Sequence, residues 1–385
     1  MKQGWEIKKL GEVCEILDSK RKPITKKDRI EGEYPYYGAT GILSYVHNFI
    51  FNEKLVLIGE DGAKWQSGEN TSFIVEGKYW VNNHAHVIRP IRKIILDEWI
   101  VFFLNFSDLT KYISGMTVPK LNQEKMRDIE IPLPPLPEQH RIVSILDEAF
   151  AAIAKAKANA ERCLSLSKVL FESYLHNVFS EKGEGWEEKT LGEVCSLITD
   201  GKHGDCENEE NSGYYFLSAK DVRNGTLIFE NARQITKEGF EETHRRTNLK
   251  PGDICMINTG ATIGRMSLAP EDPKTLNTTF QKSVAVIKPI KSLIDNKFCS
   301  YLLKADLTKL VKVSSGTAVP NLLLGDLKRH IINLPKSLKV QQSIVQKLDA
   351  LSAETKKLEA IYQKKITDLE ELKKSILQKA FNGEL

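Results

Sequence analysis

The sequence predicts an α+β protein in which two β-rich domains are separated by two long helices that pair with each other. Two observations carry this prediction. Stretches 137–179 and 338–381 both show the hydrophobic spacing of a coiled coil, and several blocks of sequence occur twice along the chain. A helix with one narrow apolar stripe cannot bury that stripe alone, so each stretch needs a partner, which the other stretch can supply.

The first long helix is predicted over 137–179. Its apolar or small side chains recur at steps that alternate between four and three residues, which is the period of a coiled-coil seam. These seam residues are Ile142, Leu146, Ala149, Ile153, Ala156, Ala160, Cys163, Ser167, Leu170 and Tyr174. After Pro137 no Pro or Gly interrupts the stretch. At about 1.5 Å per residue the helix is roughly 65 Å long.

The second long helix is predicted over 338–381, and it matches the first at a constant offset, as in Gln139 and Gln341. Its seam residues are Ile344, Leu348, Leu351, Leu358, Tyr362, Leu369, Leu372 and Ile376. The first seam is rich in Ala and the second in Leu and Ile. Small side chains opposite large ones suit the close packing of two unlike helices.

The blocks outside the helices also repeat, and in the same order. The matching pairs are 4–14 with 185–195, 86–91 with 285–290, 108–111 with 306–309, and 114–121 with 315–322. In the first pair nine of eleven residues are identical. The chain is therefore a tandem duplication, in which a block of strands is followed by a long helix and both then occur again.

The duplication predicts four segments. They are a first β-rich domain at 1–134, a central helix at 135–180, a second β-rich domain at 181–335 and a C-terminal helix at 336–385. Residues 15–80 and 196–275 share short apolar runs punctuated by Gly, Asn and Asp, but hardly any sequence. Two copies that keep one scaffold while their loops diverge are expected to bind two different ligands.

Composition and missing motifs narrow the function. The net charge of +4 permits nucleic-acid binding without indicating it, and 41% hydrophobic with 28% charged residues is typical of a soluble globular protein. We expect no signal peptide and no membrane span. Six scattered Cys without a C-x-x-C pair predict a reduced, cytoplasmic setting and no structural zinc. Neither a phosphate loop nor a Gly-rich cofactor turn is found, so we predict a non-catalytic chain without a cofactor.

Four polar clusters could contact phosphates or bases, or could equally be solvated turns: 19–23, 82–86, 199–204 and 258–265. In the second cluster, His84 and His86 share a face if they lie on a strand. Without a third ligand nearby in sequence we predict no metal, and His86 could be structural or contact DNA.

The order of these motifs resembles the specificity subunit of type I restriction–modification systems. The resemblance rests on W-E-x-x-x-L-G-E-V opening each half, on S-G-x-x-V-P-x-L, on the I-P-L-P-P-L-P-E-Q run at 131–139, and on the F-N-G-E-L ending at 381–385. It covers the whole chain. The second helix begins with L-K-V-Q in place of P-E-Q, but Gln341 keeps its position.

The resemblance implies two target recognition domains, each reading half of a split, asymmetric DNA sequence. The helices would form an antiparallel coiled coil that sets the spacing, giving the fold an internal pseudo-twofold repeat. Two copies of a modification subunit would dock on the repeated regions, bind S-adenosylmethionine and methylate adenine, and restriction subunits would join through that complex. The missing methyltransferase motifs would then belong to the partner, since adenine methylation requires a flipped base.

Combined with the polar clusters, the resemblance predicts sixteen DNA-contacting residues. They are Lys20, Arg21, Lys22, Tyr37, Thr40, Lys64, Asn83, His84, Lys202, His203, Lys220, Arg223, Asn258, Thr259, Thr262 and Arg265. Two alternatives remain at this point, a stand-alone methyltransferase and a coiled-coil scaffold with two protein-binding domains. Binding of S-adenosylmethionine by the chain alone would indicate the first, and a complex that does not bind DNA would indicate the second.

Overall fold

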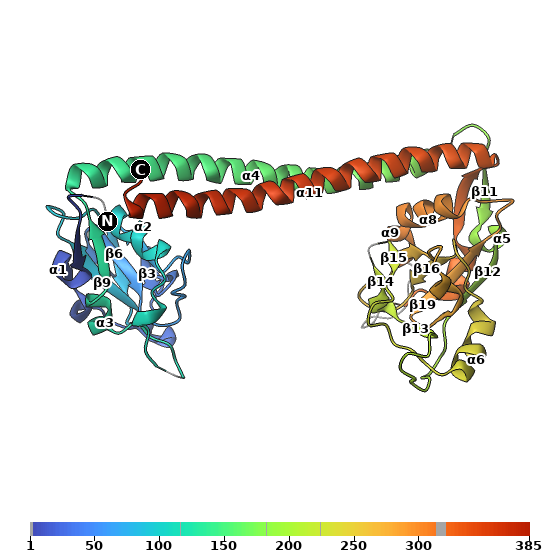
Figure 1. The fold of residues 1–385 in the computed structure, drawn as a ribbon, viewed down its shortest axis with the longest axis horizontal. Helices are drawn as coiled ribbons and strands as arrows, with labels where there is room; N and C mark the ends of the chain where they lie inside the picture. The colour runs from blue at the N-terminus through green and yellow to red at the C-terminus, as the bar shows by residue number, and fades with distance from the viewer. Residues whose placement is uncertain (1–2, 116, 182, 224, 313–320) are drawn as a thin grey trace. The chain divides into compact units, whose positions relative to one another are not determined.

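The computed structural model describes residues 3–115, 117–181, 183–223, 225–312 and 321–385. The chain divides into two compact units, 1–162 with 362–385 and 163–361 (Figure 1). This division by contacts cuts through both long helices, so each unit combines a β-rich part with a piece of each helix. The four-segment division stays a prediction. Most of the repeated motif at 315–322 lies outside the described residues.

Unit 1 is built on two four-stranded sheets. The first has the order β2-β9-β6-β7, and all its pairs are antiparallel. The second has the order β4-β3-β8-β5, with one parallel pair between β3 and β8. The strands are β2 (Cys14–Ile16), β3 (Tyr34–Gly38), β4 (Gly41–Val46), β5 (Phe51–Asn52), β6 (Leu55–Gly59), β7 (Ser72–Val75), β8 (Lys78–Val81) and β9 (Ala85–Pro90). The central strand β6 is apolar and wholly buried, which suits a strand covered on both faces.

Short helices and a two-stranded sheet complete unit 1. β1 (Glu6–Lys9) pairs with β10 (Glu130–Leu133). The helices are α1 (Leu10–Val13), η1 (Asp18–Lys20), η2 (Lys26–Asp28), α2 (Asp97–Phe106), η3 (Thr110–Tyr112) and α3 (Gln123–Arg127). Helix α2 carries Trp99, a fully buried side chain at the centre of the core, whose ring meets those of Trp5 and Phe381.

Unit 2 repeats this frame. Its four-stranded sheet has the order β12-β19-β16-β17, equivalent to β2-β9-β6-β7. The strands of the unit are β11 (Trp186–Thr190), β12 (Cys195–Asp200), β13 (Tyr215–Leu217), β14 (Val222–Arg223), β15 (Thr226–Leu227), β16 (Ile254–Ile257), β17 (Met266–Leu268), β18 (Thr278–Phe280), β19 (Val284–Pro289) and β20 (Ile331–Pro335). The pair β11–β20 corresponds to β1–β10. Its helices are α5 (Leu191–Val194), η4 (Ala219–Asp221), α6 (Lys237–Thr247), α7 (Pro273–Leu276), α8 (Asn296–Ala305), α9 (Leu307–Lys312) and α10 (Leu324–Arg329).

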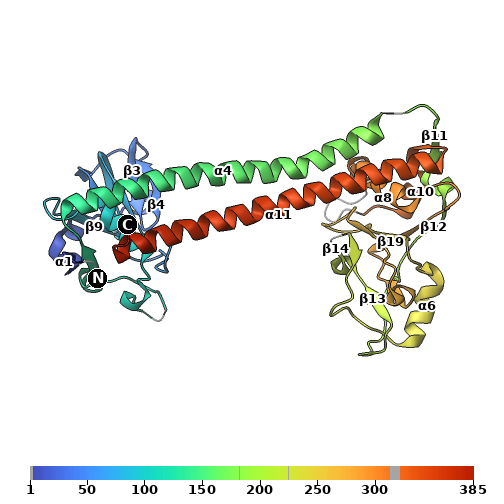
Figure 2. The same ribbon diagram turned by 45° about the horizontal axis from the view of Figure 1, so that its top comes forward.

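The two long helices are α4 (Leu136–Ser180) and α11 (Leu338–Asn382). In unit 1 the beginning of α4 and the end of α11 lie side by side (Figure 2). Both enter one core, in which Leu146 and Ala380 are fully buried. In unit 2 the relation is reversed, because Phe179 of α4 and Val345 of α11 join the same core. The helices therefore run antiparallel. This confirms the predicted fold of two β-rich parts with an antiparallel helix pair and an internal repeat.

The predicted seam is wrong near the end of α4 and at two positions of α11. Leu170 and Tyr174 are exposed, whereas Leu175 is buried. Here the helix packs on unit 2 as well as on its partner helix, since Phe171 meets Tyr301 and Phe179 meets Phe298. The steps from Ser167 to Phe179 are each four residues, which turns the apolar stripe toward α8. Leu358 and Leu372 of α11 are also exposed. Among the described residues, no helix has both the length and the apolar character needed to cross a membrane.

Candidate nucleic-acid interface

Most of the residues predicted to contact DNA in unit 1 lie in loops at one edge of the first sheet. Strand β9 runs antiparallel to β2 and β6, so the start of β9 lies beside the ends of the other two. The loops at this edge are bonded to each other. The Glu60 N–H donates to the His84 carbonyl oxygen (2.9 Å), and the Lys22 N–H donates to the Val81 carbonyl oxygen (3.2 Å). Strand β3 joins them, because the Tyr37 carbonyl oxygen accepts from the Asn82 N–H (3.0 Å).

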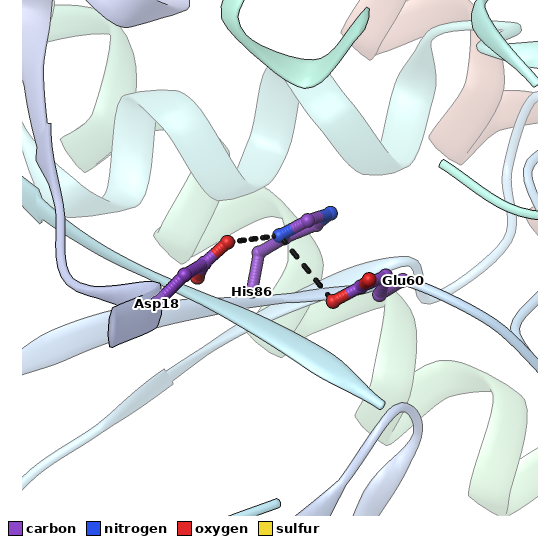
Figure 3. Close-up of side chains that lie close together, drawn as sticks. All are labelled: Asp18, Glu60 and His86. Carbon is purple, nitrogen blue, oxygen red and sulfur yellow. Dashed lines mark hydrogen bonds and ion pairs between the residues drawn. The ribbon is translucent and has the colours of Figure 1, made fainter. Parts of the chain in front are cut away.

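A group of charged side chains, buried at its two carboxylates and His86, connects the residues that carry these loops. We call Asp18, Arg21, Glu60, His86 and Lys120 the ion cluster; Figure 3 shows its two carboxylates on either side of His86. The His86 Nδ1 atom lies 2.6 Å from an Asp18 carboxylate oxygen, and the Lys120 ammonium lies 2.7 Å from Glu60. Arg21 bridges Asp18 and Glu60. The ion cluster therefore ties the ends of β2 and β6 to β9.

The pKa values of the two carboxyls reflect this pairing. Burial acts to raise the pKa of Asp18, but the hydrogen bond and charge of His86, with further bonds from Gln123 and the Val87 N–H, outweigh it, and the pKa is lowered. Burial likewise acts to raise the pKa of Glu60, and the bonds from Lys120 and Arg21 reverse the effect. Both groups are therefore carboxylates near neutral pH.

The geometry of Asp18, Glu60 and His86 could hold a metal ion, since one ligand atom from each lies within 4.8 Å of the others. The hydrogen bonds argue against that role. The His86 Nε2 atom lies 2.7 Å from the Leu121 carbonyl oxygen, which can only accept, and Nδ1 faces a carboxylate. Both ring nitrogens therefore point at acceptor oxygens of the protein, whereas a metal needs a lone pair on one of them that is directed at the ion. We interpret the ion cluster as a structural feature that positions the loops.

The equivalent edge of unit 2 has the same backbone pattern with different side chains. The Asn258 carbonyl oxygen accepts from the Leu322 N–H (2.8 Å), as the Glu60 carbonyl oxygen does from the Leu121 N–H (2.8 Å). Asn258 thus occupies the place of Glu60, and by strand register Ala285 occupies that of His86. The Thr259 hydroxyl donates to the Asn321 side-chain oxygen (2.9 Å). Neutral amides and hydroxyls stand here in place of the ion cluster.

Asp200 is the exception, since it keeps the place of Asp18 at the end of its strand. Its partners differ. Arg246 of α6 bonds one carboxylate oxygen, and the His203 Nε2 atom lies 3.1 Å from the other. In unit 2 the arginine that pairs with this carboxylate therefore comes from helix α6. In unit 1 the corresponding arginine, Arg21, comes from a loop.

The structure distributes the predicted residues of unit 1 into two groups. Six are exposed: Lys20, Lys22, Thr40, Lys64, Asn83 and His84. Of these, His84 pairs with Asp61, and Lys64 lies 3.5 Å from Glu69. The other two are packed. Arg21 belongs to the ion cluster, and the Tyr37 ring packs on Phe73 and Tyr79. Burial also raises the pKa of Tyr37. These positions favour structural roles for Arg21 and Tyr37.

The predicted residues of unit 2 are likewise divided. Four are exposed: His203, Lys220, Arg223 and Thr262. Lys202 pairs with Glu242 of α6 at 2.8 Å. Asn258 is buried, and Thr259 is half-buried. Arg265 directly precedes β17, and its guanidinium donates to the Ala219 carbonyl oxygen. This bond brings η4, which contains Lys220, close to Arg265 in space. The two loops at the start of β19 meet, since the Lys202 N–H donates to the Phe280 carbonyl oxygen (2.7 Å) and the Asn258 N–H to that of Ser283 (3.1 Å).

Sequence analysis missed Lys120 and Arg246. Lys120 lies inside the repeated motif at 114–121, next to its last residue, and the repeat itself could have drawn attention to it. Arg246 is one of two adjacent arginines in α6, and only the fold brings it to Asp200. His86, for which two roles were open, is completely buried and is therefore structural.

Two equivalent β-rich units, each with a variable loop edge and joined to an antiparallel helix pair, define a tandem recognition protein. A family model described as "Type I restriction modification DNA specificity domain" matches residues 2–161 and 183–368. The chain therefore belongs to the family of type I restriction–modification DNA specificity subunits.

Individual relatives agree with this assignment. The chain is 29% identical over 351 residues to a Haemophilus influenzae protein assigned as a type I restriction enzyme specificity subunit, covering 89% of this chain and 86% of the relative. It is 25% identical over 409 residues to the MjaVIII specificity subunit of Methanocaldococcus jannaschii, covering 100% and 93%.

Solved structures show the same fold. The HsdS subunit from Thermoanaerobacter tengcongensis superposes with a TM-score of 0.63 at 20% identity, covering 100% of this chain and 98% of that one. A chain from a study of complex assembly and conformational transition in the type I R-M system gives a TM-score of 0.76 at 22% identity, covering 100% and 99%.

Proposed function

We propose that this chain is the non-catalytic subunit that selects the DNA target of a type I restriction–modification complex. Each unit reads one half of a bipartite, gapped and asymmetric sequence through its loop edge. The observation that carries this proposal is the contrast between the two edges. They share a backbone frame, but unit 1 places the ion cluster where unit 2 has Asn258, Thr259 and Asn321. Readers that share a frame and differ in side chains recognise different sequences.

The exposed residues of each edge suit the two kinds of DNA contact. Lys22 and Lys64 present ammonium groups that can bind phosphates, which position a protein on DNA. Asn83 and His84 of unit 1, and Thr262 of unit 2, offer hydrogen bonds to base edges, which supply sequence information. The ion cluster holds the loops of unit 1 in place, so these residues need little ordering when DNA binds.

The helix pair sets the distance between the half-sites. Two uninterrupted antiparallel helices resist bending and fix the separation of whatever they join. Along α4 and α11 the seam is apolar and buried at Ile153, Ala160 and Ile366, and the Lys157 ammonium pairs with Glu370 at 2.7 Å. These contacts fix the register of the pair within unit 1.

The remaining chemistry belongs to partner subunits in the cytoplasm. Two copies of a modification subunit dock on the repeated parts of the chain, bind S-adenosylmethionine and methylate adenine, and restriction subunits join the complex. The internal repeat supports two copies, since each copy needs its own equivalent surface. The pairs β1–β10 and β11–β20, followed by α1 and α5 with the same Leu-Gly-Glu-Val sequence, provide such equivalent surfaces.

A methylation map tests the proposal. The chain is expressed with its neighbouring modification subunit in a host that lacks DNA methylation, and native DNA is sequenced for N6-methyladenine. We expect one gapped, asymmetric motif that disappears when this chain is omitted. If both proteins are soluble and associated but no motif is methylated, the recognition role is wrong.

A second measurement separates recognition from catalysis. We expect the purified chain alone to bind no S-adenosylmethionine, and the assembled complex to bind duplex DNA with strong salt dependence. Binding of the cofactor by the chain alone would contradict the assignment as a non-catalytic subunit.

A further inference from the structure

Unit 2 contains an open cavity between α8, β17 and the two long helices, and at Gly264 and Arg265 its wall includes the loop that joins β16 to β17. Its volume is about 1010 Å³. The walls come from the end of α4, from α8 and from the stretch of α11 between Asp349 and Glu359. A cavity of this size can enclose a small ligand.

The cavity is lined by more cations than carboxylates. The cations are Lys168, Arg265, Lys297, Lys304 and Lys356, and the carboxylates are those of Glu172, Asp349 and Glu359. Lys297 is neutralised by Asp349 at 2.8 Å. Among the residues that the structure describes, Lys168, Lys304 and Lys356 form no ion pair within 4.0 Å. Three exposed lysines without an ion-pair partner therefore add positive charge to the lining of this open cavity.

The lysines act on each other inside the cavity. Burial lowers the pKa of the Lys304 ammonium, and the charge of Lys356 lowers it further, whereas Asp349 acts in the opposite direction. Lys304 also lies over the Tyr301 ring, with its ammonium 5.3 Å from the ring centre. Lys304 and Lys356 repel each other, and an anion bound between them would relieve that repulsion.

Buried polar groups without partners face the same cavity. Ser267 is 2% exposed, and its hydroxyl makes no hydrogen bond to any described residue. The Arg265 Nε–H is likewise buried and unpaired within the described part of the chain. A buried donor without a partner is costly, so each of these groups is suited to bond a ligand that enters the cavity.

The equivalent place in unit 1 provides a natural comparison. Gln139 and Gln341 anchor the two units in the same way, so Phe102 and Asn105 stand where unit 2 has Tyr301 and Lys304. On the long helices, Phe150 and Ala154 stand where unit 2 has Ser352 and Lys356.

The Phe102 and Phe150 rings pack together there with their centres 5.5 Å apart. In unit 1 aromatic rings thus occupy the positions of the hydroxyl residues Tyr301 and Ser352, and the neutral Asn105 and Ala154 occupy those of the cations Lys304 and Lys356. The cationic cavity is therefore a feature of unit 2 and no consequence of the shared frame.

We propose that this cavity binds a phosphate group, held by Lys304 and Lys356, with Ser267 and Arg265 donating hydrogen bonds from the cavity wall. A phosphate has several strong acceptor oxygens and at least one full negative charge, which matches several cations together with neutral donors. The phosphate could be that of a small ligand or of a nucleic-acid backbone. The proposal does not rest on the reading of a bipartite target.

Binding of inorganic phosphate to the full chain tests the site. Calorimetric titration with sodium phosphate, at an ionic strength held constant with sodium chloride, should show one saturable site. The double variant Lys304→Gln/Lys356→Gln should weaken that site by about tenfold or more, because two charge-assisted contacts are lost. Ser267→Ala should weaken it about fivefold without changing the charge of the protein.

The double variant Lys312→Gln/Lys357→Gln is the matched control. It removes two exposed lysines from the same unit, one on α9 and one next to Lys356, and neither lines the cavity. We expect its phosphate affinity to equal that of the unmodified chain. As a second readout, phosphate should raise the melting temperature of the control and of the unmodified chain but not that of Lys304→Gln/Lys356→Gln.

Competition distinguishes the two sources of phosphate. Displacement of inorganic phosphate by a 20-base-pair duplex would identify the backbone as the ligand, and retention would identify a small phosphorylated compound; either supports the site. The proposal is overturned if phosphate does not saturate and duplex affinity is the same in the two double variants. Equal losses in both double variants, or equally tight binding of a polyglutamate peptide, would also overturn it.

Discussion

Gln139 and Gln341 make the same three hydrogen bonds in the two units. The Gln139 side-chain oxygen accepts from the Leu96 N–H (3.0 Å), and its amide donates to the Ile94 and Pro134 carbonyl oxygens (2.8 Å each). Gln341 bonds the Asp295 N–H (2.8 Å) and the Leu293 and Pro335 carbonyl oxygens (3.1 and 2.8 Å).

Both glutamines are completely buried. One amide side chain thus joins the first turns of each long helix to the start of a short helix, α2 or α8, and to the strand before the long helix. Because no other polar side chain could satisfy one donor and two acceptors in this shape, the residue recurs where its neighbours have changed.

Replacing Gln139 by Leu should loosen the start of α2 without disturbing α8. The substitution leaves a buried N–H and two carbonyl oxygens unpaired, which costs about 2–4 kcal/mol in local stability. Hydrogen exchange should become faster at the Leu96 amide while the Asp295 amide is unchanged, and Gln341→Leu should give the reverse result. The exposed neighbour Gln342 supplies the control, since Gln342→Leu should alter neither amide by more than about 0.5 kcal/mol. Acceleration at both sites in one variant would contradict independent anchoring.

The ion cluster should make unit 1 sensitive to acid. The pKa values of Asp18 and Glu60 are lowered in the folded state, so the unfolded chain binds protons more readily in the range between the folded values and the unfolded values near 4. The stability that these groups contribute is present above about pH 4 and is lost as the pH falls through the folded values.

A variant isolates this effect. Glu60→Gln should lower the stability of unit 1 at pH 7 by about 3–5 kcal/mol, because Lys120 and Arg21 lose a buried partner. It should also reduce the acid sensitivity of that unit. Glu69→Gln, which affects only an exposed pair with Lys64, is expected to stay within about 0.5 kcal/mol. Urea titrations from pH 3 to 7 would measure both, and an unchanged pH profile in Glu60→Gln would count against the role given to the ion cluster.

The loop edge of unit 1 should control one half-site only. Asn83→Ala should relax the sequence requirement at one or two positions of a single half, with a loss of about 10- to 100-fold in discrimination, since a good base contact is worth about 1–3 kcal/mol. The half-site read by unit 2 should be unchanged. Methylation mapping of the complex would measure both halves at once.

Lys93→Ala is the matched control for the edge. Lys93 is exposed and follows the other end of β9, so it lies at the opposite end of that strand from the proposed interface. The variant should leave the motif and the extent of methylation unaltered. If Lys93→Ala relaxes the motif as Asn83→Ala does, the interface has been placed on the wrong edge.

Lengthening both long helices equally should lengthen the gap in the target. The Lys157–Glu370 pair marks opposite positions on the two helices. Seven residues inserted after Ala160 therefore lie opposite seven residues inserted after Ile366. The insertion adds about 10 Å to the pair, equivalent to about three base pairs. The methylated motif should keep both half-sites and gain that spacing. An insertion in α4 alone should disrupt the pair, and an unchanged gap after the matched insertion would defeat the spacing hypothesis.

Much of the fold could be predicted because it follows from the periodic spacing of apolar residues and from blocks of sequence that occur twice. The 3.5-residue seam predicted both long helices, and the recurrence of 4–14 at 185–195 predicted two equivalent β-rich parts. The errors occur where helix packing changes partners. Leu170 and Tyr174 continue the seam by spacing, but α4 turns Phe171 and Phe179 toward α8 instead.

The sequence by itself determined the class of this protein, since repeats, helix periods and missing catalytic motifs are local properties of the chain. Only the tertiary structure decided what individual polar residues do. Arg21 and His86 are as polar in sequence as Lys22 and His84. In the fold, however, Arg21 is largely buried against Glu60 and His86 is buried against Asp18, whereas Lys22 and His84 are exposed. Burial and ion pairing depend on contacts between residues far apart in the chain. The cationic cavity of unit 2 could not be predicted for the same reason, because its lysines come from three helices, α4, α8 and α11, that meet only in the folded protein.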